Sequence, residues 1–168
     1  SPLEDEALPQ AEALLLGGGY PELFAERLSE NGAMRSAVRA FPGPIVAECG
    51  GYMYLSEGLW VGERFFPMVG LAPGEARMAD RPVLGYREVE ALKDTPVARK
   101  GERLKGHEFH YARLPPSPSP AWRRVGGEEV EGWTDGRVLA SFVHLYLPAR
   151  PEAARRLLAQ GGSGHFQK

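Results

Sequence analysis

The sequence of 168 residues is poor in cysteine, since Cys49 is the single one. One cysteine excludes an internal disulfide, and it leaves too few thiolates for a structural zinc site built on cysteine. This usage is typical of a protein in a reducing compartment. We therefore expect a cytoplasmic location.

The chain also lacks a charge excess and a long apolar run. Its 20 Lys and Arg residues nearly balance 22 Asp and Glu residues, for a formal net charge of -2. This balance gives no electrostatic reason to expect a nucleic acid or an anionic membrane as a partner. No apolar run approaches the ~20 residues needed to span a bilayer. Residues 1–6 are acidic where a signal peptide would be basic, so we expect neither export nor a membrane span.

The first part of the sequence predicts an α/β fold. Short apolar runs at residues 11–16 and 45–47 are typical of buried parallel strands. Between them, the apolar spacing of residues 21–39, interrupted at Asn31 and Gly32, predicts two helices or one kinked helix. Alternating strands and helices indicate a mostly parallel sheet that is flanked by helices.

The second part of the sequence is strand-rich. Residues 151–160 predict a last helix with proline in its first turn, and residues 161–168 are interpreted as a flexible tail. Length and composition suit a single domain over residues 1–160. The segments with strand-like composition, several of them with period-two alternation, are 65–71, 83–92, 102–114 and 138–147.

Cys49 is the candidate nucleophile. It follows the apolar run 45–47 and precedes Gly50 and Gly51. This is the arrangement of a nucleophile elbow with Cys in place of Ser, which needs small neighbours because the backbone passes close to itself. We expect the following helix N-terminus to lower the pKa of the thiol, and the N–H of Gly50 to point toward a developing oxyanion. A small buried apolar residue is the commonest fate of a lone cysteine, so spacing alone leaves both interpretations open.

A glycine turn accompanies this motif. Gly17, Gly18 and Gly19 follow the run 11–16, and they should meet Cys49 at the same carboxyl edge of the sheet. Their N–H groups could complete an oxyanion hole or hold a substrate. The turn has neither the Gly-Lys-Ser/Thr ending of a phosphate loop nor a dinucleotide pattern. A plain tight turn would also account for the glycines.

A cysteine nucleophile needs a base, and the sequence has four histidines. His144 ends an apolar run, so we expect it at a strand's carboxyl edge beside the other two motifs, with a satisfied core histidine as the alternative. His165 lies in the predicted tail. A strand would place Glu108 and His110 on one face and His107 on the other. Their spacing matches no zinc motif, so we expect structural or substrate-contacting roles and no metal site.

Five motifs, in order along the chain, carry a resemblance to a known family. Over about residues 2–158, the sequence resembles the glutaminase domain of the cobyrinic acid a,c-diamide synthases, in the cobyric acid synthase-like branch of class I glutamine amidotransferases. Any one motif would be weak evidence, but the five together are specific. They are GGGYPEL at 17–23, AECGGYMYL at 47–55, LGYRE at 84–88, GHEFHY at 106–111 and ASFVH at 140–144.

The resemblance implies a flavodoxin-like fold and a cysteine-dependent glutaminase. Cys49 would attack the side-chain carboxamide of glutamine, and His144 would raise its nucleophilicity. A γ-glutamyl thioester would form and be hydrolysed after ammonia leaves. Many class I amidotransferases have a Glu two residues after the histidine, but Tyr146 stands there, so we expect a Cys-His dyad whose third orienting group is unassigned. The predicted oxyanion and substrate-binding residues are Gly18, Gly19, Gly50, Tyr52 and Glu108.

The resemblance also implies partners outside this chain. The family's glutaminase domain begins a strand and a helix before Ser1, and it follows a synthetase domain that uses ATP and Mg²⁺. We expect glutamine as the substrate of this chain and no cofactor on it. The ammonia would amidate the a and c carboxylates of cobyrinic acid, a corrin, in cobalamin biosynthesis. Alternatives are a sister acceptor such as that of cobyric acid synthase or another amidoligase, a non-catalytic structural fragment, or a separate thiol hydrolase. The sequence leaves open whether the protein forms a homo-oligomer.

Overall fold

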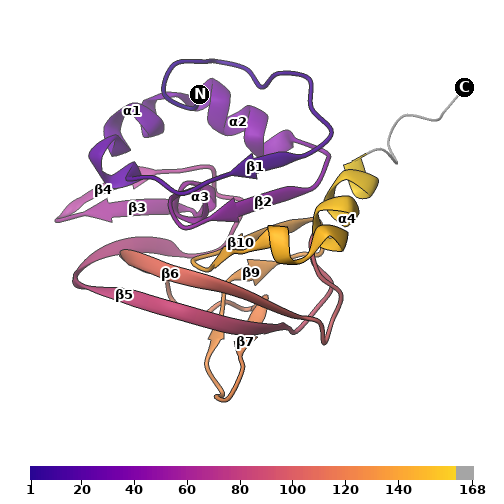
Figure 1. Cartoon of the computed structure of the whole chain (residues 1–168). Helices are drawn as coiled ribbons and strands as arrows, with labels where there is room; N and C mark the ends of the chain where they lie inside the picture. Colours follow the sequence, from indigo (N-terminus) through magenta and orange to yellow (C-terminus); the bar gives the residue numbers. More distant parts are fainter. Residues whose placement is uncertain (162–168) are drawn as a thin grey trace, which may run out of the picture.

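The computed structural model describes residues 1–161 and builds them into two β-sheets with helices packed around them (Figure 1). The first sheet has four strands in the order β1-β2-β10-β9. Strands β1, β2 and β10 run parallel, and β9 pairs antiparallel with β10. The strands are β1 (Leu14–Leu16), β2 (Ile45–Glu48), β10 (Val138–Ser141) and β9 (Trp133–Thr134).

Helices connect the parallel strands. A short 3₁₀ helix η1 (Pro21–Leu23), α1 (Ala25–Glu30) and α2 (Gly32–Ala40) lie between β1 and β2 in the chain, and α3 (Gly50–Leu55) follows β2. The predicted interruption is confirmed. The side chain of Asn31 accepts the N–H of Met34 and so caps α2, because an Asn oxygen satisfies one of the free donors of a helix start.

The second sheet has seven strands, five of them in the order β11-β6-β5-β3-β4, with β7 pairing to β5 and β8 to β7. Its pairings are antiparallel except that between β3 and β5. The prediction of one mostly parallel sheet therefore holds for the first sheet only, because antiparallel strands need no crossover helix. The strands are β3 (Gly58–Val61), β4 (Arg64–Pro67), β5 (Glu75–Ala91), β6 (Arg103–Arg113), β7 (Trp122–Arg124), β8 (Val130–Glu131) and β11 (His144–Leu145).

The other predictions for the second half are largely confirmed. The segments 83–92 and 102–114 form most of β5 and β6, whereas 138–147 divides into β10 and β11. The predicted last helix is α4 (Pro151–Gly161), preceded by a 3₁₀ helix η2 (Leu147–Ala149). The end of the predicted tail, with His165, lies outside the described residues. Within the part that is described, no helix is long and apolar enough to cross a membrane.

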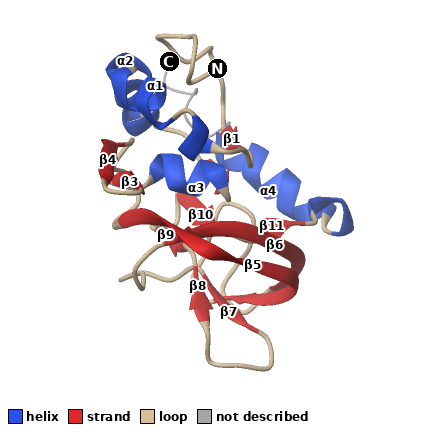
Figure 2. Cartoon of the chain, turned by 90° about the vertical axis from the view of Figure 1, so that its left-hand side faces the viewer, coloured by secondary structure: helices blue, strands red, loops and turns tan. Residues whose placement is uncertain are grey.

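The alternating side chains of the first sheet divide the interior into two cores. Ile45 and Ala47 of β2 face one core, which they share with α1, α2 and α3. Val46 faces the other core, where Trp122 of β7 and Ala153 of α4 are buried. The first sheet thus lies between the α1–α2 layer and the strands β5, β6 and β7, whereas β3 and β4 of the second sheet pack beside α1. The β7–β8 hairpin lies at the end remote from α1 and α2 (Figure 2).

A carboxylate anchors the connection from β10 to β11. Glu131 of β8 keeps some exposed surface, but its carboxylate accepts the N–H of Phe142 at 2.6 Å and the hydroxyl of Ser141 at 2.7 Å. Burial raises its pKa to about 7, although both hydrogen bonds favour the charged form. The segment that leads to His144 is therefore held by a group that binds a proton in the folded protein near neutral pH.

We predict that this carboxylate lowers stability as the pH rises. The folded state keeps the proton of Glu131 up to about pH 7, whereas the unfolded chain releases it near pH 4.5. Ionisation between these values therefore costs the folded state about 1–3 kcal/mol. Urea unfolding should show Glu131→Gln gaining free energy of unfolding relative to wild type between pH 5 and pH 8. The exposed Glu128→Gln is the matched control, and a Glu131→Gln difference that stays constant with pH would contradict the assignment.

Candidate active site

Cys49 occupies a strained turn between β2 and α3. Its backbone has φ 53° and ψ -106°, and it is the one non-glycine residue with positive φ among residues 1–161. Such a conformation is costly for a residue with a Cβ, and it persists only where the surrounding structure holds it. The N–H of Cys49 donates to the carbonyl of Ser141 in β10 at 2.8 Å. The predicted tight turn from strand to helix is therefore present at Cys49, and its role as a nucleophile elbow stays a prediction.

The start of α3 packs unusually close to the β1 strand and the glycine turn. A Cβ on Gly51 would lie within 2.3 Å of the carbonyl oxygen of Leu16, and one on Gly50 within 2.9 Å of the carbonyl oxygen of Gly19. The N–H of Gly51 donates to the carbonyl of Gly17 at 3.1 Å. The two predicted glycine motifs thus lie against each other, because only glycine permits this separation.

His144 reaches the same place from the second sheet. It lies in β11, where it pairs in register with His107 of β6, and the two rings stack with centroids 4.9 Å apart at 11°. A Cβ on Gly18 would lie 2.9 Å from Cε1 of His144. The imidazole is therefore bounded by the glycine turn and by His107. The sequence predicts His144 at the carboxyl edge of a strand beside the other two motifs. In the structure it lies beside the glycine turn, but in the short strand β11 that follows the end of β10.

The environment of the thiol overturns one expectation. Cys49 is 8% exposed, and burial raises its pKa above 9.0, with the charges of Glu22 and Glu48 acting in the same direction. The N–H of Gly50 lowers this pKa, but less than burial raises it. The prediction of a lowered pKa is therefore wrong, since α3 has only six residues and the sulfur is desolvated. The neutral thiol donates to the carbonyl of Phe109 at 3.7 Å.

His144 is suited to take the thiol proton. Burial lowers its pKa below 6.5, and the charge of His107 acts in the same direction. A neutral imidazole near pH 7 can accept a proton, and a neutral thiol must lose one before or during attack. The residues of the site thus favour proton transfer during attack over a preformed thiolate–imidazolium pair. No hydrogen bond joins Cys49 to His144 within the described residues, and catalytic hydrogen bonds often tighten only when substrate binds.

Sequence reasoning missed two neighbours of this pair. Glu48, the last residue of β2, places Oε2 3.8 Å from Nδ1 of His144. Phe109 presents its backbone carbonyl to the thiol. A carboxylate directly beside the candidate nucleophile, at the end of a buried strand, is a signal that could have pointed to Glu48. No feature of the sequence indicates a backbone carbonyl.

Comparison with known proteins agrees with this geometry. Residues 1–152 match the CobB/CobQ-like glutamine amidotransferase domain family. The chain belongs to this family. The fold also resembles PurLQS from Thermotoga maritima, with a TM-score of 0.62, 18% identity and coverage of 94% of this chain and 82% of that one. A second solved structure, a glutamine amidotransferase, has a TM-score of 0.61 at 20% identity and covers 90% of this chain and 79% of its own.

Curated relatives of this amidotransferase domain are much longer than the chain. It is 40% identical over 161 residues to the cobyrinate a,c-diamide synthase of Picrophilus torridus, covering 94% of this chain and 36% of that protein. It is 46% identical to the synthase of the same name from Syntrophotalea carbinolica, covering 92% and 37%. The hydrogenobyrinate a,c-diamide synthase of Streptomyces coelicolor is 41% identical, with coverage of 94% and 33%. The chain therefore spans about a third of their length.

Two residues predicted to bind substrate are buried in the amidotransferase domain. Tyr52 is 3% exposed, and its ring packs against that of Phe142 with centroids 5.1 Å apart. Glu108 has a side chain 1% exposed that accepts hydrogen bonds from Arg87 at 2.7 Å and Arg124 at 2.8 Å. Both side chains thus make internal contacts in this structure, and their role in substrate binding stays a prediction. The alternation of β6 explains Glu108, because it turns this side chain inward while its neighbours His107 and Phe109 face out.

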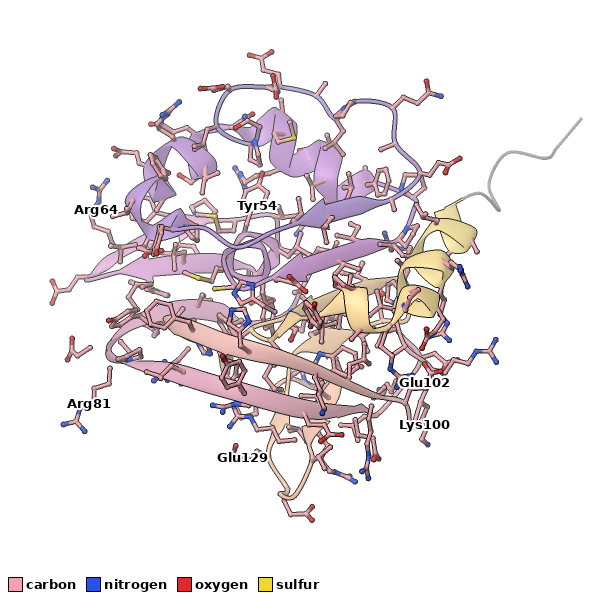
Figure 3. The ribbon with its side chains drawn as sticks, in the orientation of Figure 1. Tyr54, Arg64, Arg81, Lys100, Glu102 and Glu129 are labelled. Atoms are coloured by element: carbon pink, nitrogen blue, oxygen red, sulfur yellow. The ribbon has the colours of Figure 1, made fainter. Side chains whose placement is uncertain are left out.

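Glu108, Arg87 and Arg124 form a cluster of ion pairs that joins three strands of the second sheet, β6, β5 and β7. Arg124 of β7 pairs with Glu108 and also with Glu129. Glu129 lies in the turn of the β7–β8 hairpin (Figure 3). Removing one partner of a buried ion pair leaves an uncompensated charge, so these residues depend on one another. No group of three or more His, Cys, Asp or Glu residues able to hold a metal ion is found within residues 1–161.

The close packing of α3 on β1 makes a stability prediction. Gly51→Ala should lower the free energy of unfolding by about 1–3 kcal/mol, because the added methyl group meets the carbonyl of Leu16. Gly17→Ala is the matched control, since a Cβ there meets nothing within 4 Å. Urea unfolding monitored by circular dichroism compares the two. Equal midpoints for both variants would show that the approach is looser than described.

The buried thiol makes a reactivity prediction. The rate of alkylation of Cys49 by iodoacetamide, followed by intact mass, should rise with pH and show a midpoint above 9.0, because burial raises the pKa of the thiol. Cys49→Ser gives the blank, since no other cysteine is present. A midpoint below pH 8 would instead show a thiolate that forms before substrate binds.

Proposed function

We propose that this chain hydrolyses glutamine through Cys49 and His144 and supplies the ammonia to a longer amide-forming synthase. The observation that supports this most directly is the convergence at one place of three parts: the nucleophile elbow, the glycine turn and a histidine with lowered pKa. Membership of the amidotransferase family supports glutamine hydrolysis as the reaction, and the geometry supports Cys49 and His144 as the groups that perform it.

The first half-reaction acylates the enzyme. The sulfur of Cys49 bonds to the side-chain carboxamide carbon of glutamine while the thiol proton passes to His144. The charge that develops on the carboxamide oxygen is stabilised by backbone N–H groups of Gly50 and of Gly18 or Gly19. The imidazolium then gives its proton to the amide nitrogen, the C–N bond breaks, and ammonia leaves. A γ-glutamyl thioester remains on Cys49.

The second half-reaction returns the free enzyme. Water attacks the thioester carbon and gives a proton to His144, which is again the base. The C–S bond breaks, the sulfur of Cys49 recovers a proton from the imidazolium, and glutamate leaves. One histidine thus serves as base and acid in both halves. Its lowered pKa keeps it neutral at the start of each.

We propose amidation of the a and c carboxylates of cobyrinic acid, in cobalamin biosynthesis, as the use of this ammonia. Support comes from relatives named cobyrinate a,c-diamide synthase, at 40% and 46% identity. ATP and Mg²⁺ would act on the part of the synthase outside this chain. A second acceptor is metal-free hydrogenobyrinic acid, because the relative from Streptomyces coelicolor at 41% identity carries that name. Offering both acids to the full-length synthase with ATP separates the two.

Glutamate release tests the proposed function. Cys49→Ser should reduce glutaminase activity to background, because the weaker hydroxyl nucleophile has no thiolate-like reactivity. His144→Gln should reduce kcat by about 10²–10⁴-fold through loss of the general base. The full-length synthase is the proper protein for the assay, and thermal melting shows whether each variant is folded.

A glutamine analogue with a diazoketone in place of its carboxamide gives an independent measurement. It should add once, to Cys49, and glutamine should suppress the adduct. Unchanged glutamate release in Cys49→Ser would overturn the proposal. Turnover of peptides or esters without turnover of glutamine would favour a separate thiol hydrolase.

A further inference from the structure

Glu48 joins three parts of the site. It ends β2, it precedes Cys49, and in the parallel ladder it lies in register with Ser141 at the end of β10. Its side chain, 16% exposed, extends past that end to β11. There Oε1 accepts the N–H of Leu145 at 3.0 Å, while Oε2 lies 3.8 Å from Nδ1 of His144. One carboxylate therefore accepts a hydrogen bond from the backbone of the histidine strand and lies within 4 Å of its ring, beyond hydrogen-bond distance in the resting structure.

The residue two positions after His144 cannot take this role. Tyr146 stands there, is 62% exposed, and has no carboxylate. Among the described groups, the Glu48 carboxylate is the acidic one that lies within 4 Å of the imidazole. It comes from the strand that carries the nucleophile and not from the strand that carries the histidine.

We propose that Glu48 is the positioning residue of the Cys49–His144 pair: its carboxylate orients the imidazole through Nδ1, so that Nε2 is left to accept the thiol proton. The inference rests on the proposed function, because it assigns a role within the same reaction. A carboxylate beside Nδ1 favours the tautomer protonated there and stabilises the imidazolium that forms during attack. The bond from Leu145 fixes the other oxygen, so the carboxylate is held in place.

Other charged groups also face this pair. His107 stacks on His144 from β6, and its charge disfavours the imidazolium. Glu22, from η1, raises the pKa of Cys49 by its charge, as Glu48 does. Glu48 differs from Glu22 in its contact with the imidazole. A variant of Glu22 therefore separates a general effect of negative charge on the thiol from the orientation of His144.

Glu48→Gln is the decisive substitution. Its amide oxygen can still accept the N–H of Leu145, so the backbone bond is kept while the charge beside Nδ1 is lost. In the resting protein, the pKa of His144 measured by ¹H–¹⁵N NMR should fall, because the carboxylate 3.8 Å from its Nδ1 has lost its negative charge. The spectrum of the His107→Gln variant lacks the signals of His107, so it shows which NMR signals belong to His144. Glu22→Gln should leave the pKa of His144 unchanged.

Kinetics of the full-length synthase give the second readout. Glu48→Gln should lower kcat of glutaminase by about 10²-fold, with KM within about threefold of wild type. Glu48→Asp, which keeps the charge at shorter reach, should recover part of the loss. A purely structural role predicts that Glu48→Gln, which keeps the Leu145 bond, behaves as wild type. Melting curves identify any variant that fails to fold.

The outcomes separate this inference from the function on which it rests. An unchanged pKa of His144 together with unchanged kcat in Glu48→Gln overturns the role of Glu48 and leaves glutamine hydrolysis standing. A wild-type synthase that releases no glutamate overturns the proposed function. In that case the NMR measurement still decides whether Glu48 orients the imidazole.

Discussion

The structure of the site depends on how closely the first turn of α3 packs against β1 and the glycine turn. Gly50 and Gly51 leave no room for a Cβ against Gly19 and Leu16. This packing holds Cys49 in its positive-φ conformation, because neither neighbouring segment can move away without breaking the Gly51 to Gly17 hydrogen bond. Backbone strain at Cys49 is thus maintained by the close packing of the neighbouring segments.

The site is formed by residues from both sheets. The parallel strands β2 and β10 present Cys49 at their carboxyl ends, as open α/β sheets present ligands. The antiparallel β6 then brings His107 and the Phe109 carbonyl to this edge and pairs with β11, which carries His144. The ion pairs of Glu108 with Arg87 and Arg124 join β6 to β5 and β7, and they account for the burial of a charged side chain in this motif.

Burial sets the protonation states of the reacting groups. Desolvation penalises a charge of either sign, so it raises the pKa of Cys49 and lowers that of His144. Both groups are therefore neutral near pH 7, and the charged pair is favoured only once attack has begun. The carboxylate of Glu48 lies 3.8 Å from Nδ1 of His144, and burial raises its own pKa as it does that of Cys49.

The local elements were predictable from the sequence, because their signals are local. Apolar runs, helical spacing and the break at Asn31 predicted most of the strands and helices, and the small residues around Cys49 predicted the tight turn that is present there. The resemblance to known sequences predicted the amidotransferase family and the roles of Cys49 and His144. Three features depended on tertiary structure: the division into two sheets, the inward direction of Glu108, and the meeting of Glu48 with His144. Strand pairing and burial join residues that are far apart in the chain, and the raised pKa of Cys49 is a consequence of that burial. A local sequence pattern predicts neither which distant strands pair nor which side chains are buried.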